Sequence, residues 1–87
     1  MDIRELRQQI DKIDRELVDL FLQRMEFSSQ VAQYKKEHDM PIFVPAREQE
    51  IKVALAAQAG PEMAHFVERL YDTIFTLSRE HQEEVLK

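Results

Sequence analysis

The sequence contains no cysteine, a single glycine, three prolines and no long apolar run. Without cysteine the chain has neither a disulfide framework nor a thiolate metal site, which fits a reducing compartment, so we expect a cytoplasmic location. No apolar segment approaches membrane-spanning length, and the first residues are charged from position 2 onward. We therefore expect neither a membrane span nor an export signal.

The chain has 87 residues, of which 44% are hydrophobic and 33% are charged, with few glycines and prolines. This composition is typical of a folded, helix-rich protein rather than a disordered one, and we expect one domain covering residues 1–87. A domain of this length has a small core, which a partner chain would help to stabilise. The net charge of -5 argues against a nucleic-acid surface, so any anion site has to be local.

Motifs for phosphate binding, covalent catalysis and metal binding are also absent. The sequence has no glycine-rich phosphate loop, no nucleophile elbow and no Ser/His/Asp order. The histidines at positions 38, 65 and 81 do not have the spacing of zinc ligands. The sequence therefore indicates no metal and no cofactor.

A continuous helical seam occupies the first part of the chain. Its seam residues recur at alternating steps of three and four from Ile3 to Tyr34, and no glycine or proline interrupts them before Pro41. We predict a first helix from about residue 2 to about residue 37, roughly 50 Å long. A compact globule of this size has a radius of gyration of only about 12 Å and cannot cover such a helix. We therefore predict an intertwined homodimer.

Two shorter helices are predicted after the first. Residues 38–45 contain two prolines and an extended apolar run, which is typical of a loop. A second helix over 45–59 stops at Gly60-Pro61, and helical spacing returns over 63–85. The predicted fold class is all-α: three helices per chain, one of them very long, interlocked as a helical homodimer.

Polar residues occupy seam positions where apolar ones are expected. Arg24 stands in place of Leu or Ile, and a guanidinium there needs a carboxylate or an anionic ligand. Lys35 lies at nearly the same azimuth eleven residues later, with Ser28 between them. In the third helix the apolar stripe continues into Ser78 and Gln82. For the two cations taken singly, a glutamate partner for Arg24 and solvent exposure for Lys35 are the simpler interpretations.

The second helix begins with Arg47 and Glu48. The amide dipoles at a helix start favour Glu48 but not Arg47, unless Arg47 serves a ligand or a carboxylate elsewhere. These unexpected polar and charged residues come from three helices, and all of them could face one cavity. A common binding site explains them better than independent coincidences do. They predict a local site for a small polyanionic metabolite.

In combination these segments resemble the all-helical class of chorismate mutases, over essentially the whole chain. The resemblance is carried by Leu6-Arg7-x-x-Ile10-Asp11-x-Ile13-Asp14, Leu17 to Arg24, Lys35, Pro41-Ile42-x-x-Pro45-x-Arg47-Glu48 and Ser78-x-x-x-Gln82. It implies three helices per subunit interlocked as a dimer. It also implies an isomerase that rearranges chorismate to prephenate in phenylalanine and tyrosine biosynthesis, without a cofactor.

The resemblance implies a substrate-binding role for four residues. Arg24 and Arg47, with Arg7 supplied by the other subunit, would bind the two carboxylates of chorismate. Ser78 would assist near a carboxylate. Arg7 is indicated by the resemblance alone, because nothing in the helical pattern singles it out.

Three further residues are implied to be catalytic. Lys35 and Gln82 would donate hydrogen bonds to the ether oxygen of chorismate, and Glu48 would hold its ring hydroxyl. The sequence departs from the family at Val44, where the family often has Asp before the proline of the second helix. An Asp there could cap the helix, and loss of a cap typically costs about 1 kcal/mol.

Two other functions stay open at this point. An isochorismate pyruvate lyase shares the fold and resembles the pattern, but it tends to lack a glutamate where this chain has Glu48, which favours the mutase. A non-catalytic dimerisation module would use the cations in salt bridges and bind nothing. Tight binding of a dicarboxylate transition-state mimic would distinguish the enzyme from the module.

Overall fold

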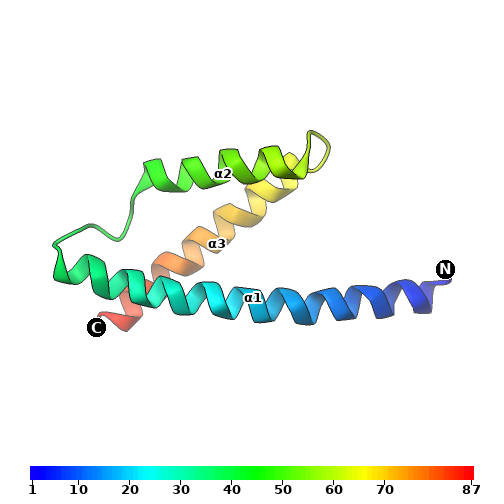
Figure 1. Ribbon diagram of the computed structural model, residues 1–87, viewed down its shortest axis with the longest axis horizontal. Coiled ribbons are helices and arrows are strands. Elements are labelled where there is room, and N and C mark those ends of the chain that lie inside the picture. Colours follow the sequence, from blue (N-terminus) through cyan, green and yellow to red (C-terminus); the bar gives the residue numbers. More distant parts are fainter.

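The computed structural model describes all 87 residues as three helices without a strand (Figure 1). Helix α1 spans Ile3–Glu37, α2 spans Pro45–Ala59 and α3 spans Ala64–Val85. The predicted all-α class, with one very long helix, is confirmed. None of the three helices combines the length and apolar composition that a membrane span requires.

The helix ends follow from the residues at them. Asp2 caps α1 by accepting a hydrogen bond from the backbone N–H of Glu5 at 2.9 Å. Val44 precedes α2 and makes no side-chain cap, as its aliphatic side chain predicts. Gly60 follows α2 with a φ of 86°, a conformation that a residue with a Cβ adopts only with strain.

Helix α3 holds the molecule together, because it packs against both other helices while α1 and α2 do not pack on each other. Figure 1 shows α3 crossing from the far end of α2 to the C-terminal part of α1. The loop 38–44 closes the opposite side, between the end of α1 and the start of α2. Helix α3 and the loop thus connect α1 to α2 at the two ends of α2.

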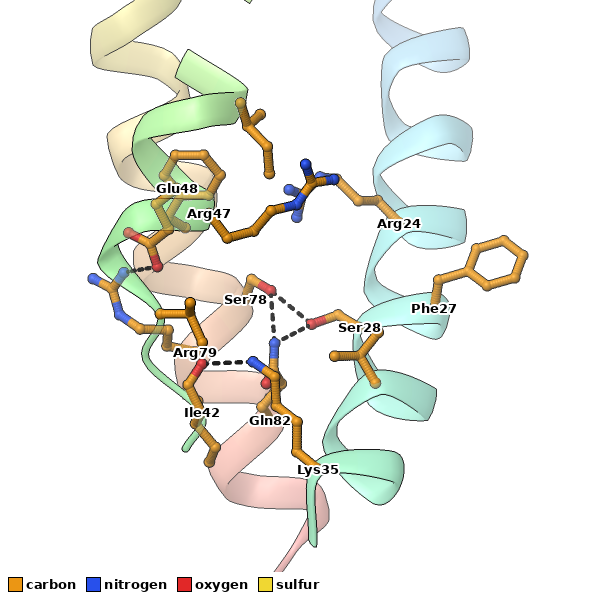
Figure 2. Close-up of a pocket in the computed structure, with 14 residues that line it drawn as sticks. Arg24, Phe27, Ser28, Lys35, Ile42, Arg47, Glu48, Ser78, Arg79 and Gln82 are labelled. Carbon is orange, nitrogen blue, oxygen red and sulfur yellow. Dashed lines mark hydrogen bonds and ion pairs between the residues drawn. The ribbon is translucent and has the colours of Figure 1, made fainter. Parts of the chain in front are cut away.

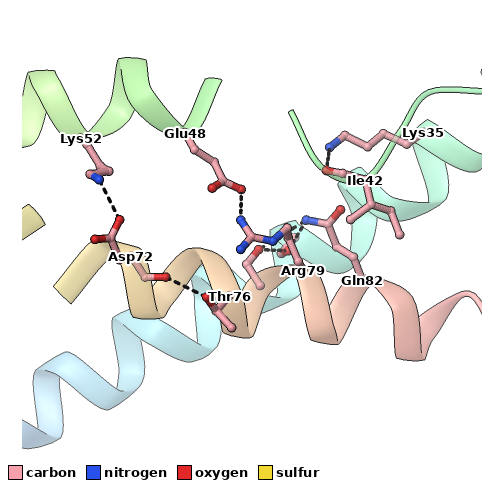
Figure 3. A network of polar contacts seen from close by, with 10 residues as sticks. Lys35, Ile42, Glu48, Lys52, Asp72, Thr76, Arg79 and Gln82 are labelled. Atoms are coloured by element: carbon pink, nitrogen blue, oxygen red, sulfur yellow. Dashed lines mark hydrogen bonds and ion pairs between the residues drawn. The ribbon is translucent and has the colours of Figure 1, made fainter. Parts of the chain in front are cut away.

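The ion pair of Lys52 with Asp72 is one of two that connect α2 to α3. Lys52 Nζ lies 2.7 Å from Asp72 Oδ1, and the hydrogen bond to this carboxylate raises the pKa of Lys52 above its ordinary value of 10.5 (Figure 3). A raised lysine pKa stabilises the fold below the ordinary value, and the contribution is lost as the pH rises through the raised value. The Lys52 ammonium therefore keeps its charge at neutral pH.

The core of the single chain is very small. Only five of the 87 residues are buried, and three of these are polar. The apolar stripe of α1 lies open to solvent: Ile10 and Leu17 are each 55% exposed. The N-terminal part of α1 extends alone beyond the other helices (Figure 1), so the chain measures 54 × 27 × 14 Å, with a radius of gyration of 15.9 Å. Half of the longest helix lacks any covering surface within its own chain.

Candidate active site

A cavity of about 360 Å³ lies where the C-terminal half of α1, the loop, the start of α2 and the end of α3 meet (Figure 2). Every site residue expected from the sequence lines it except Arg7: Arg24, Lys35, Arg47, Glu48, Ser78 and Gln82. Arg7 is exposed on α1, about 26 Å along the helix from Arg24 at 1.5 Å per residue. The cavity therefore brings together six of the seven residues, and Arg7 of the same chain does not reach it.

Arg24 enters the cavity without a carboxylate partner from its own chain. Its guanidinium carbon lies 5.9 Å from the ring centre of Tyr71 and 5.8 Å from that of Phe75, so two aromatic faces of α3 support it. Within the chain, the interpretation that Arg24 pairs with a glutamate of another helix is wrong. Its hydrogen-bond donors are free for an anion.

A buried polar cluster joins α1 to α3 at the inner wall of the cavity. Ser28, Ser78 and Gln82 are each only 7% exposed. The two serine hydroxyls are 2.6 Å apart, and Gln82 Nε2 donates to Ser28 Oγ at 3.0 Å and, more weakly, to Ser78 Oγ at 3.4 Å (Figure 2). Gln82 Oε1 is buried with no hydrogen-bond partner. An incompletely satisfied amide in a cavity wall is suited to a polar ligand.

Lys35 connects α1 to the loop. Its Nζ donates to the backbone carbonyl of Ile42 at 2.8 Å and is partly buried, so the simple interpretation that it extends into water is wrong. An ammonium group has three donors, and this bond uses one of them. The other two are available to a ligand in the cavity.

Glu48 is the only carboxylate that lines the cavity, and it forms an ion pair with Arg79 of α3 (Figure 3). Arg79 was not indicated by the sequence, although it follows Ser78 directly. Because one helical step is 100°, Arg79 lies to the side of the inward stripe, where a charged residue is ordinary. Only the position of α2 beside α3 reveals its partner.

Arg47 lies at the cavity rim. It pairs with Glu50 one turn along α2 at 2.6 Å, and its side chain is 63% exposed. This pair explains why a cation is tolerated near the helix start. A pair this exposed contributes little stability, so a ligand could take over the guanidinium at small cost.

The cavity is electropositive in a chain whose net charge is -5. Arg24, Lys35, Arg47 and Arg79 line it, against the one carboxylate of Glu48. An anionic molecule with two carboxylates fits this balance, because cations that are partly withdrawn from water gain from an opposite charge.

The sequence profile of the family described as chorismate mutase type II matches residues 6–83, which include most of all three helices. The chain belongs to the chorismate mutase type II family. The resemblance inferred from the sequence is therefore confirmed. The matched range contains all the expected site residues, from Arg7 to Gln82.

Several curated relatives agree with this family. The T-protein of Haemophilus influenzae is 48% identical over 46 residues, which are 53% of this chain and 12% of the relative. The bifunctional chorismate mutase/prephenate dehydratase of Aquifex aeolicus is 38% identical over 50 residues, 58% of this chain and 14% of the relative. The 4-amino-4-deoxychorismate mutase of Streptomyces venezuelae is 31% identical over 78 residues, 86% of this chain and 75% of the relative.

The match to the first relatives covers only 12 to 14% of their length. These three relatives are thus much longer than this chain, whereas the Streptomyces protein is comparable in length. No solved structure matches the chain significantly.

Proposed function

We propose that this chain is a chorismate mutase, an isomerase that converts chorismate to prephenate in the biosynthesis of phenylalanine and tyrosine. The observation that carries the proposal is Arg24, a cation in an apolar seam that no carboxylate of its chain neutralises. Family membership agrees with it. A cation that is partly withdrawn from water and has no partner gains from an anionic ligand that supplies the opposite charge.

The proposed reaction suits a site without a nucleophile. The rearrangement is intramolecular and pericyclic, so the enzyme accelerates it by holding the enolpyruvyl arm over the ring in a reactive conformer. In the proposal Arg24 and Arg47 hold the carboxylates, with Ser78 nearby. Arginine suits this task because its planar fork binds a carboxylate through two hydrogen bonds and stays charged.

The catalytic contribution is electrostatic in this proposal. As the carbon–oxygen bond breaks, negative charge grows on the ether oxygen, and Lys35 and Gln82 donate hydrogen bonds to it. Such donors act more strongly on the transition state than on the ground state. Lys35 retains two free donors, and the weaker contact of Gln82 Nε2 to Ser78 leaves one N–H to redirect. In the proposal Glu48 accepts a hydrogen bond from the ring hydroxyl.

The proposal includes an intertwined homodimer in which Arg7 of one subunit completes the site of the other. The exposed apolar stripe of α1 and the small core support this assembly, because both require a covering surface. Arg7 lies on the projecting half of α1, the part that would cross the partner. It would add a third arginine to the carboxylate-binding set.

The decisive experiment incubates the purified chain with chorismate and, in parallel, with isochorismate, and identifies the products. Formation of prephenate from chorismate is expected. Release of pyruvate from isochorismate would instead identify a lyase. A folded protein that converts neither compound and does not bind a dicarboxylate transition-state mimic would be the dimerisation module.

A further inference from the structure

The carboxylate of Glu48 is already shared with a cation of the protein. Arg79 Nη1 donates to Glu48 Oε2, and the two side chains are 29% and 23% exposed, so the pair is partly shielded from water (Figure 3). Glu48 Oε1 has no hydrogen-bond partner. The cavity therefore offers one free acceptor oxygen whose negative charge is largely compensated by the guanidinium.

A second contact holds Arg79 in place. Its guanidinium carbon lies 4.7 Å from the ring centre of Phe43, in the loop that borders the cavity. The ring and the carboxylate come from different segments, the loop and α2. Because both fix the guanidinium, its positive charge stays beside Glu48 at the cavity wall.

We infer that Arg79 determines which ring substituent can lie against Glu48. It makes the cavity prefer a substrate with a neutral hydroxyl at this position over one with a positively charged amine. The inference rests on the proposed function, in which Glu48 holds the ring hydroxyl of chorismate. A hydroxyl can donate to the free Oε1 regardless of the nearby guanidinium. An ammonium group would meet a like charge at short range and a carboxylate that is already paired.

The competing substrate is defined by its chemistry. One relative is named as a mutase of 4-amino-4-deoxychorismate, in which an amine replaces one hydroxyl of chorismate. An alkyl amine is protonated at neutral pH. This chain is therefore expected to disfavour 4-amino-4-deoxychorismate, although 86% of it aligns with that relative at 31% identity.

The test compares kcat/KM for chorismate and for 4-amino-4-deoxychorismate in the wild-type chain, Arg79→Met and Arg79→Lys. Wild type is expected to prefer chorismate. Arg79→Met keeps an apolar side chain against Phe43 but removes the charge, and it is expected to reduce the preference by about tenfold or more. Arg79→Lys keeps the charge and is expected to retain most of the preference.

A structural role alone would affect both substrates equally. An unchanged preference in Arg79→Met would therefore overturn the inference, and so would an Arg79→Lys variant that behaves like Arg79→Met. Circular dichroism verifies that both variants fold. A wild-type chain that converts neither compound refutes the proposed function, whereas equal kcat/KM for both compounds refutes the selectivity.

Discussion

Arg24 is held by two aromatic faces and by no carboxylate of its own chain. A cation–π contact orients a guanidinium without using its N–H groups, so all five donors stay available. A residue placed in this way has donors available to a ligand. Ser28 is the opposite case, since its hydroxyl bridges two helices within the buried cluster.

Replacing Arg24 with Ala is expected to abolish most turnover while the helices persist. The fold should persist because no charged group of the chain loses an ion-pair partner. One carboxylate of the substrate would lose its partner, so we expect kcat/KM for chorismate to fall by about 100-fold or more. Steady-state kinetics and circular dichroism measure the two effects. Arg24→Lys is the matched control, with a smaller loss because it keeps the charge without the fork. Normal turnover by Arg24→Ala would show that the anion-site argument is wrong.

Replacing Ser28 with Ala is expected to lower stability. The change removes the acceptor of the 3.0 Å bond from Gln82 and leaves a buried amide donor with only its weaker contact. We expect the free energy of unfolding to fall by about 1–3 kcal/mol. Urea titration at fixed protein concentration measures it, with the partly exposed neighbour Ser29→Ala as the control. Equal stability of the two variants would contradict the role given to the cluster.

At the level of elements, α2 begins without the cap that α1 has. The Asp2 side chain accepts a hydrogen bond from a backbone N–H of α1, whereas the Val44 side chain has no acceptor for the N–H groups of α2. The start of α2 carries Arg47 and Glu48, so the order of this turn affects the site directly.

Replacing Val44 with Asp or Asn is expected to stabilise α2. Either side chain can accept a hydrogen bond from a backbone N–H of the first turn that has no partner in the helix. Such a cap stabilises the fold by about 1 kcal/mol, which corresponds to a rise in Tm of about 4–8 °C for a domain of this size. Thermal melting at one protein concentration measures the rise, and Val44→Ala, which cannot cap, is the control. A Tm unchanged in both capping variants would mean that the turn is already satisfied in another way.

The helix boundaries could be predicted because each depends on local chemistry. Gly60 adopts a positive φ after α2, and a proline begins α2. The inward positions of Arg24, Ser78 and Gln82 followed from the helical period. The pair of Glu48 and Arg79 could not be predicted, because it depends on how α2 lies beside α3, and periodicity places Arg79 off the inward face. In the proposal Arg7 acts from a second chain, which no helical period describes.

At the scale of the whole molecule, an apolar stripe about as long as half of α1 has no cover within the chain. A second copy covers this stripe in the proposed dimer, and the site is then built from two chains. Subunit exchange can test both statements at once.

Mixing Arg7→Ala chains with Arg24→Ala chains is expected to restore activity. Each variant alone lacks one arginine in every site, but a mixed dimer contains one complete site. After unfolding and refolding in equal amounts, about a quarter of the wild-type activity should return, since half of the dimers are mixed and half of their sites are complete. Sedimentation checks the assembly. A folded monomer at micromolar concentration, or a mixture with no more activity than its components, would refute the shared site.

The tyrosine ring beside Arg24 gives the chain an intrinsic fluorescent probe of its cavity. The sequence has no tryptophan and only two tyrosines, so its near-ultraviolet emission comes mainly from Tyr34 and Tyr71. Tyr34 stacks on His38 at the end of α1, whereas Tyr71 lies under the Arg24 guanidinium. In a Tyr34→Phe variant the remaining tyrosine would report any ligand that draws Arg24 away from the ring, so binding could be followed by fluorescence without a label.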